Sequence, residues 1–121
     1  ESMAKNAIVF ACANPVPEIS PERALKGGAA VVGTGSSKYP NQINNLLVFP
    51  GLFRGALDAK TAKITDQMMM AAAYGIANSV ADDQLSATYV LPKAIDRRAH
   101  EAVAKAVKEA ALSDENFEQR R

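Results

Sequence analysis

One short segment limits the folds open to this chain more than any other. Residues 7–13 are seven apolar residues in succession, without the polar alternation of a strand that has one wet face. A run this short and this uniformly apolar is typical of a strand buried on both faces, as in a parallel sheet. Asn14-Pro15 follows, and because proline has no backbone N–H for a sheet, the strand is expected to end there. The sequence therefore favours an α/β fold.

A second strand and a connecting helix are predicted directly after the first strand. Ser20 is a good helix N-cap, Pro21 suits a first helical position, and Gly27-Gly28 marks the end of that helix. Residues 29–33 form a second apolar run. Together these segments predict a βαβ unit at about residues 7–35, and such crossovers are right-handed in nearly all proteins.

The remaining apolar residues have helical spacing. We expect a helical remainder over about residues 42–112, followed by a polar tail at 113–121 that frays at the end of the chain. Its helices are predicted at 42–58 with a bend at Pro50-Gly51, at 66–80 after a Thr65 or Asp66 cap, and from an Asp96 cap to about 112. The residues expected to face inward on the second of these helices are Met69, Ala72, Ala73, Ile76 and Val80.

Two parallel strands alone do not make a stable sheet, because each leaves an edge unpaired. A strand buried on both faces needs neighbours that we do not find in the sequence. We therefore expect the chain to be the second half of an open α/β domain, with the first half upstream of Glu1.

Charge and cysteine content exclude several classes of function. Lys plus Arg is 14 and Asp plus Glu is 13, a net charge of +1, which argues against binding to nucleic acid or an anionic membrane. Cys12 and His100 are single, so neither an internal disulfide nor a Cys/His metal cluster is expected. No apolar run approaches the roughly 20 residues that span a bilayer. The composition favours a reduced, soluble, cytoplasmic protein.

Amide side chains follow the two predicted strands. In open parallel sheets, ligands bind beyond the carboxyl ends of the strands. Asn14 leaves the first strand, and the Asn44-Asn45 pair ends the loop that leaves the second. Neutral amides offer both donors and acceptors, which suits a carboxylate or a carboxamide. Asparagine is also common as a turn residue and as a helix cap, so both a ligand-binding role and a structural role are open for these residues.

Other polar residues have plainer interpretations. Cys12 is expected to be a buried small hydrophobe, and His100 to lie on a solvated helix face. Arg54 lies within an apolar helix, where it either pairs with Asp58 one turn later or reaches the ligand crevice.

Three stretches of the sequence resemble the malic enzymes, specifically the compact bacterial type. They are residues 8–19 with Asn-Pro-Val-Pro-Glu, residues 31–35 with Val-Val-Gly-Thr-Gly, and residues 39–58. The last stretch combines Pro-Asn-Gln-Ile-Asn-Asn with Phe-Pro-Gly-Leu-Phe-Arg-Gly-Ala and is the most specific. A looser resemblance continues to the final helix. Ser36 and Lys38 depart from the family pattern, which usually has an arginine and an acid there.

The resemblance implies oxidative decarboxylation of malate to pyruvate and CO₂ with NAD or NADP, assisted by Mg²⁺ or Mn²⁺. It implies that residues 1–121 are part of an NAD(P)-binding domain: the second half of its Rossmann-like parallel sheet, followed within the chain by C-terminal helices. Asn14, Asn44 and Asn45 match the family residues that contact malate and the nicotinamide end of the cofactor. The family's catalytic base and metal ligands belong to upstream segments, so no catalytic or metal-binding residue is expected in this chain.

The resemblance also implies that the chain's partners are the rest of a malic enzyme chain and further copies in a homo-oligomer. The chain alone is expected to be inactive. Two other functions stay open: a fragment of a malolactic-type decarboxylase, and a non-catalytic interaction module. The choice between NAD and NADP is open too, because the acid that contacts the ribose hydroxyl lies upstream.

Overall fold

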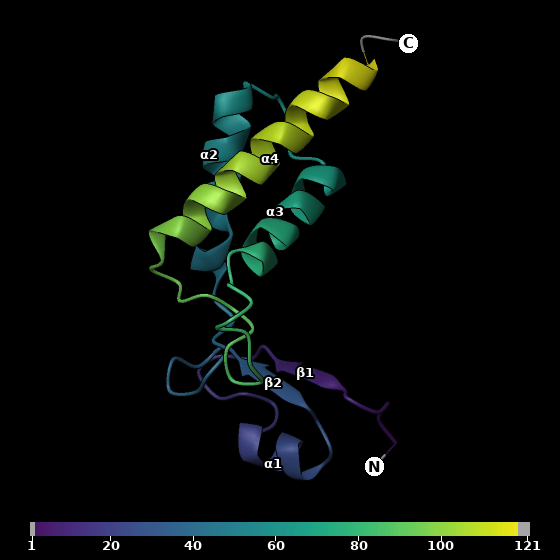
Figure 1. Cartoon of the computed structure of the whole chain (residues 1–121), viewed down its shortest axis with the longest axis vertical. Helices are drawn as coiled ribbons and strands as arrows, with labels where there is room; N and C mark the ends of the chain where they lie inside the picture. The colour runs from purple at the N-terminus through teal and green to yellow at the C-terminus, as the bar shows by residue number, and fades with distance from the viewer. Residues whose placement is uncertain (1, 119–121) are drawn as a thin grey trace. The chain divides into compact units, whose positions relative to one another are not determined.

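The chain forms two compact units in a computed structural model, which describes residues 2–118 (Figure 1). The first unit comprises Glu1–Asn44 and Val80–Lys93, and the second comprises Asn45–Ser79 and Ala94–Arg121. No helix in the described part of the chain is long and apolar enough to cross a membrane.

The first unit contains the predicted βαβ arrangement. Its elements are β1 (Ile8–Ala11), α1 (Pro21–Lys26) and β2 (Val31–Thr34). The two strands are parallel, with Ile8 opposite Val31 and Ala11 opposite Thr34. The Ser20 hydroxyl accepts a hydrogen bond from the Arg23 N–H at 3.4 Å, and Gly27 is the C-cap of α1. These capping predictions are confirmed.

The first unit buries only one face of its sheet in the described residues. Its core consists of Ala24, Ala29 and Val32, with Val9 and Ile19 packed against them. The opposite face carries Ile8 and Phe10, whose side chains are 63% and 51% exposed. The prediction that β1 is buried on both faces is therefore wrong here, because α1 covers one face and no described element covers the other.

The second unit is built from the helices α2 (Phe49–Ala59), α3 (Asp66–Asn78) and α4 (Arg97–Glu118). Helix α4 packs against both of the others (Figure 1). A short 3₁₀ turn, η1 (Asn45–Leu47), precedes α2. The core residues of this unit are Leu52, Ala59, Met68, Ala72, Val103, Val107 and Ala111.

Side-chain caps begin two of these helices where the sequence predicts them. The Thr65 hydroxyl accepts a hydrogen bond from the Met68 N–H at 3.3 Å. The Asp96 carboxylate accepts one from the Arg98 N–H at 2.9 Å, which lowers the pKa of Asp96. Each cap satisfies one of the N–H groups that a helix start leaves without an intrahelical partner.

Glycines let the helices approach one another closely. A Cβ at Gly51 would lie 2.7 Å from the Cβ of Val103, and one at Gly55 would lie 2.5 Å from the Ala104 carbonyl oxygen. Gly75 brings α3 similarly near the α4 backbone at Val103, with 3.0 Å from its would-be Cβ to the Cα there. At Gly51 and Gly55 these distances are shorter than Cβ atoms show in real structures, so the packing of α2 on α4 depends on glycine there. At Gly75 a Cβ would be a tight contact that requires α4 to shift by a few tenths of an ångström.

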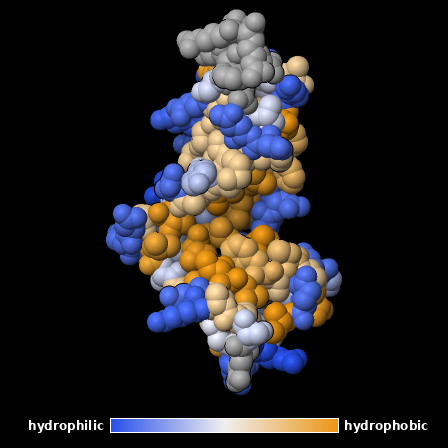
Figure 2. All heavy atoms as spheres, turned by 90° about the vertical axis from the view of Figure 1, so that its right-hand side faces the viewer, coloured by the Kyte–Doolittle hydropathy of each residue, from blue (hydrophilic) through white to orange (hydrophobic). Residues whose placement is uncertain are grey.

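The predicted helix at 42–58 differs from the structure. Its first part is the 3₁₀ turn η1, and α2 begins only at Phe49. Pro50 therefore lies in the first turn of α2 rather than at a bend, because a proline there has no intrahelical hydrogen bond to lose. One side of this segment is exposed and apolar: Leu46, Phe49, Phe53 and Leu57. Figure 2 shows apolar side chains reaching the surface beside charged ones.

The inward face of α3 is also corrected by the structure. Met68 and Ala72 are fully buried, whereas Met69 is 50% exposed and Ala73 is exposed. Ala72 and Ile76 therefore face the core as predicted, whereas Met68 and Gly75 take the inward positions expected for Met69 and Ala73. The helix ends at Asn78, so Val80 lies beyond it.

The last helix is longer than predicted. Its residues Ala99, Val103 and Val107 are fully buried. The helix continues to Glu118 instead of ending near residue 112 and fraying from 113. Backbone hydrogen bonds between residues four apart stabilise a helix without any need for apolar side chains, so the polar segment can remain helical. Residues 119–121 of the predicted tail lie outside the described part of the chain.

Candidate functional site at the carboxyl edge of the strands

Three segments of the first unit meet where β1 and β2 end. The Gly35 N–H donates a hydrogen bond to the Ala11 carbonyl at 3.3 Å. On the other side of β2, Gln42 forms a parallel bridge with Thr34, and the Ile43 N–H donates to the Thr34 carbonyl at 2.7 Å. Because all three segments run in the same direction, their next residues emerge at one edge.

Asn14 lies at this edge with an exposed side chain. A Cβ at Gly35 would lie 3.7 Å from the Cβ of Asn14 and 3.1 Å from the Cys12 carbonyl oxygen. The loop that follows β2 therefore packs directly against the loop that follows β1. A larger residue at position 35 would push these two loops apart. Asn14 keeps its amide available to a ligand, since no hydrogen bond engages that amide in the described residues.

The loop that carries Asn14 is held by an acid that our sequence analysis did not single out. The Glu18 carboxylate accepts a hydrogen bond from the Ala13 N–H at 3.0 Å. This bond lowers the pKa of Glu18, because it stabilises the charged carboxylate. A glutamate that follows two prolines in a turn was the available signal, since the prolines leave the turn short of backbone donors.

The other two predicted site residues lie in different units. Asn44 is half-buried and follows the paired Gln42 by two residues, so the topology brings it to the same edge as Asn14. Asn45 is exposed, and it begins η1 as the first residue of the second unit. The topology of the first unit therefore places Asn14 and Asn44 after segments that end at the same edge.

The first asparagine of the Pro-Asn-Gln-Ile-Asn-Asn motif has a structural role. Asn41 is buried, and its amide donates to the carbonyls of Val32 at 3.1 Å and Ala87 at 2.9 Å. Its Oδ1 accepts a hydrogen bond from the Val90 N–H at 2.9 Å. Asn41 also has a φ of 56°, a left-handed conformation that asparagine tolerates better than most residues. It ties the returning segment 80–93 to β2.

The two positions that depart from the family pattern lie in the turn after β2. The Thr34 hydroxyl accepts from the Ser36 N–H at 3.2 Å, and the Ser36 hydroxyl accepts from the Lys38 N–H at 3.3 Å. Ser36 therefore shapes its own turn. Lys38 is exposed.

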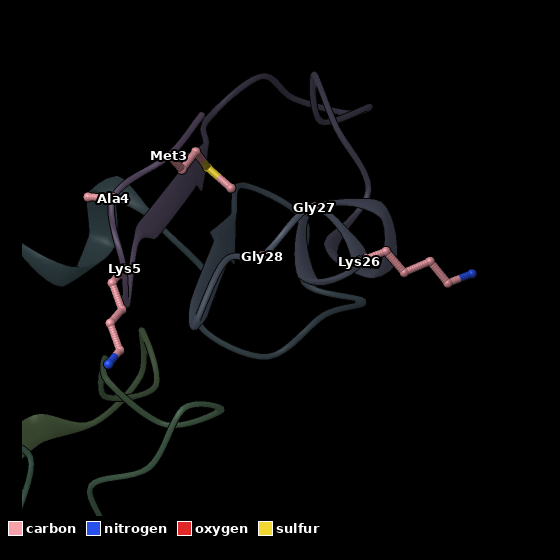
Figure 3. A pocket seen from close by; sticks show the side chains of 6 residues that line it. All are labelled: Met3, Ala4, Lys5, Lys26, Gly27 and Gly28. Atoms are coloured by element: carbon pink, nitrogen blue, oxygen red, sulfur yellow. The ribbon is translucent and has the colours of Figure 1, made fainter. Parts of the chain in front are cut away.

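Two cavities are lined by residues other than these. One, of about 320 Å³, is lined by Met3–Lys5 and Lys26–Gly28 (Figure 3). These residues precede β1 and β2, so this cavity lies at the amino ends of the strands. Its lysines, Lys5 and Lys26, extend away from one another (Figure 3). The other cavity, of about 520 Å³, lies on α2 and α4 of the second unit.

Arg54 lines this second cavity and forms an ion pair with Asp58 at 3.0 Å, which confirms the pairing alternative for that arginine. Cys12 is exposed, contrary to prediction, because it lies just past the end of β1. His100 is partly buried, and its Nε2 lies 2.7 Å from the Ala94 carbonyl oxygen, so it is not a solvated residue. Among the described residues, no group of three or more His, Cys, Asp or Glu side chains is placed to hold a metal ion.

Parallel strands joined by a helix, with amide-bearing loops at their carboxyl ends, define a Rossmann-like α/β architecture. Comparison with known proteins names the family. The family profile described as "Malic enzyme, NAD binding domain" matches residues 1–112. The chain therefore belongs to the malic enzyme family, as its motifs predict.

Individual relatives agree with this assignment. The chain is 56% identical over 112 residues to the bifunctional malic/malolactic enzyme of Bacillus subtilis, covering 93% of this chain and 27% of that protein. It is 50% identical over 111 residues to the NAD-dependent malic enzyme of Geobacillus stearothermophilus, covering 92% and 23%. The crystal structure of malic enzyme from Pyrococcus horikoshii matches with a TM-score of 0.87 and 50% identity, covering 93% and 26%. The chain spans about a quarter of the length of the curated relatives it matches.

Proposed function

We propose that this chain is part of a longer malic enzyme, which oxidatively decarboxylates malate to pyruvate and CO₂ with NAD or NADP. The observation that carries the proposal is the family match over residues 1–112, in a chain that presents the exposed Asn14 amide at the carboxyl edge of its strands. In this proposal the chain supplies one wall of the crevice for substrate and cofactor. Asn14, Asn44 and Asn45 contact the two ligands.

The chemistry of the edge fits such ligands. An amide donates to a carboxylate or pairs with a carboxamide without adding charge, so it orients malate or the nicotinamide ring rather than attracting any anion. Gly35 has no side chain, so none fills the space beside Asn14 at this edge. NAD(P), when bound, supplies the hydride acceptor. The residues of this chain bind and orient.

The proposal assigns the general base and the ligands of Mg²⁺ or Mn²⁺ to segments outside this chain. Oxidation of a hydroxyl needs a base for its proton, and decarboxylation needs a cation for the developing enolate charge. The cytoplasmic location and the homo-oligomeric state also belong to the proposal. The choice between NAD and NADP stays open, because relatives are named for either cofactor.

A malolactic-type activity is the second candidate, and one comparison favours it. The relative at 56% identity is named a bifunctional malic/malolactic enzyme. Product analysis of the full-length enzyme separates the two activities: malic activity releases pyruvate with one NAD(P)H per malate, whereas malolactic activity releases lactate without net NAD(P)H. A non-catalytic module would release neither product.

Alanine substitutions in the full-length enzyme test the site. Replacing Asn14 or Asn45 should lower kcat/KM for malate roughly ten- to a hundred-fold, since a ligand-orienting amide contributes on the order of 1–3 kcal/mol. The effect of Asn44→Ala tests the third position. Asn78 is exposed at the end of α3, so Asn78→Ala is the matched control and should behave as wild type. Wild-type kcat/KM in both Asn14→Ala and Asn45→Ala would show that these amides are turn and cap residues.

A further inference from the structure

The loop between β1 and α1 is held in place by few interactions of its own. Val16 is 75% exposed, and Asn14 is exposed as well, so burial does little to fix this segment. Pro15 and Pro17 have no backbone N–H to donate. In the described part of the chain, no backbone–backbone hydrogen bond joins the two sides of the loop. Its shape must therefore be fixed from its ends.

Both ends of the loop are anchored in the first unit. Ala11 is buried, and its carbonyl accepts the hydrogen bond from the Gly35 N–H. Ile19 packs against the core cluster beneath α1. Between these anchors, the Glu18 carboxylate accepts the Ala13 N–H at 3.0 Å and so closes the segment 14–17 into a ring. An ionised acceptor makes this hydrogen bond stronger than a neutral one.

This hydrogen bond acts one residue away from the proposed ligand group. It fixes the orientation of the Ala13 N–H, and hence of the peptide plane between Cys12 and Ala13, which is one peptide before the plane that joins Ala13 to Asn14. The Cβ of Asn14 then lies beside Gly35, 3.7 Å from the position of a Cβ there. Without the bond, the loop would keep its two anchored ends, but Asn14 would sample many orientations.

We propose that Glu18 is a positioning residue, which closes the loop through the Ala13 N–H and so holds the Asn14 amide ready for malate or the nicotinamide end of the cofactor. This inference rests on the proposed function, because it takes Asn14 as a ligand-binding residue. Glu18 itself touches no ligand in this scheme. Its carboxylate accepts a hydrogen bond from the backbone of its own loop.

Steady-state kinetics of the full-length enzyme test the inference through a series at position 18. Glu18→Ala should lower kcat/KM for malate about three- to ten-fold, since it removes one charge-assisted hydrogen bond. Glu18→Gln should stay within about two-fold of wild type, because the amide oxygen still accepts the same bond. Glu18→Asp is one methylene too short to reach the Ala13 N–H with the loop in place, so it should resemble Glu18→Ala. This variant also answers the question if the alanine variant fails to fold.

Two further variants separate positioning from general effects. Glu22 is an exposed acid that pairs with Lys26 at 2.8 Å outside the loop, so Glu22→Ala is the matched loss of charge and should leave kcat/KM unchanged. In the double variant with Asn14→Ala, the loss of Glu18 should cost less than about two-fold more, because both changes remove the same contribution.

Each outcome is decisive. Wild-type kinetics in both Glu18→Ala and Glu18→Asp, or additive losses in the double variant, would overturn the positioning role while leaving the proposed function intact. A Glu18→Gln variant as impaired as Glu18→Ala would also overturn it, because the bond to Ala13 would then not be the cause. Wild-type kinetics in Asn14→Ala would instead refute the site assignment in the proposed function.

Discussion

Replacing Gly55 by alanine tests the helix packing of the second unit, because two physical effects predict opposite results. Alanine stabilises a helix interior by about 1 kcal/mol relative to glycine. If α2 were an isolated helix, the substitution would therefore raise the free energy of unfolding. In the structure, however, the new methyl group would lie 2.5 Å from the Ala104 carbonyl oxygen and 2.8 Å from the Cβ of Val107.

The steric conflict with α4 should outweigh the gain in helix propensity. The nearest atom belongs to the backbone of a helix and cannot rotate away, so α2 and α4 must separate. Overpacking a core typically costs about 1–3 kcal/mol, and this case belongs at the upper end because backbone and Cβ atoms are involved. After subtraction of the helix-propensity gain, Gly55→Ala should lower the free energy of unfolding by about 2 kcal/mol.

Urea unfolding followed by circular dichroism at 222 nm measures this change. Ala73 lies exposed on α3, so Ala73→Gly calibrates the propensity effect alone and should cost about 1 kcal/mol. The two substitutions are formal reverses of one another, yet both should destabilise the protein. A Gly55→Ala variant that is as stable as wild type, or more stable, would refute the packing argument.

Three further predictions concern the first unit and the isolated chain. Asn41→Ala removes three hydrogen bonds and places alanine at positive φ, so it should lower the free energy of unfolding in urea by roughly 3–4 kcal/mol. Asn41→Gly removes the same hydrogen bonds without the strain at positive φ, so its loss should be about 1 kcal/mol smaller. Equal losses in the two variants would contradict the contribution of the backbone. The hydrogen bond from Ala13 lowers the folded-state pKa of Glu18, so its stabilisation is complete above the ordinary value near 4.5 and is lost as pH falls through the lowered pKa. The urea midpoint should therefore fall less steeply below pH 4.5 in Glu18→Gln than in wild type, and parallel curves would refute this. The 121-residue chain alone should form no NAD(P)H from malate with Mg²⁺ or Mn²⁺. Any increase in absorbance at 340 nm that depends on malate would contradict this prediction.

The sequence predicted the elements whose cause is local. Ser20, Thr65 and Asp96 cap helices where the pattern places them, because a cap depends on a side chain and a backbone N–H only a few residues apart. The parallel pair of strands was predicted for a related reason: a continuous apolar run and a short helical connection leave few other arrangements.

The errors arose where a distant partner decides the outcome. On α3, Met69 and Ala73 were predicted to face inward in place of Met68 and Gly75, because a glycine is a weak position in an apolar pattern. Gly75 is nevertheless a point at which α4 approaches closely. Similarly, Ile8 and Phe10 are exposed although their run is uniformly apolar, since burial depends on what covers the sheet. A pattern of apolar residues gives the faces that prefer burial, and tertiary contacts decide which of them achieve it.

The asparagines of the 41–45 stretch illustrate the same limit for function. Asn41, Asn44 and Asn45 lie within five residues, and composition treats all three alike. The structure distinguishes them through their surroundings: Asn41 is buried with its amide satisfied by three backbone partners, whereas Asn45 is exposed. An amide that already satisfies its hydrogen bonds inside the protein has little left to offer a ligand, because every new bond would replace an existing one. The exposed asparagines are therefore the ones whose substitution should alter kinetics, and the buried one should alter stability.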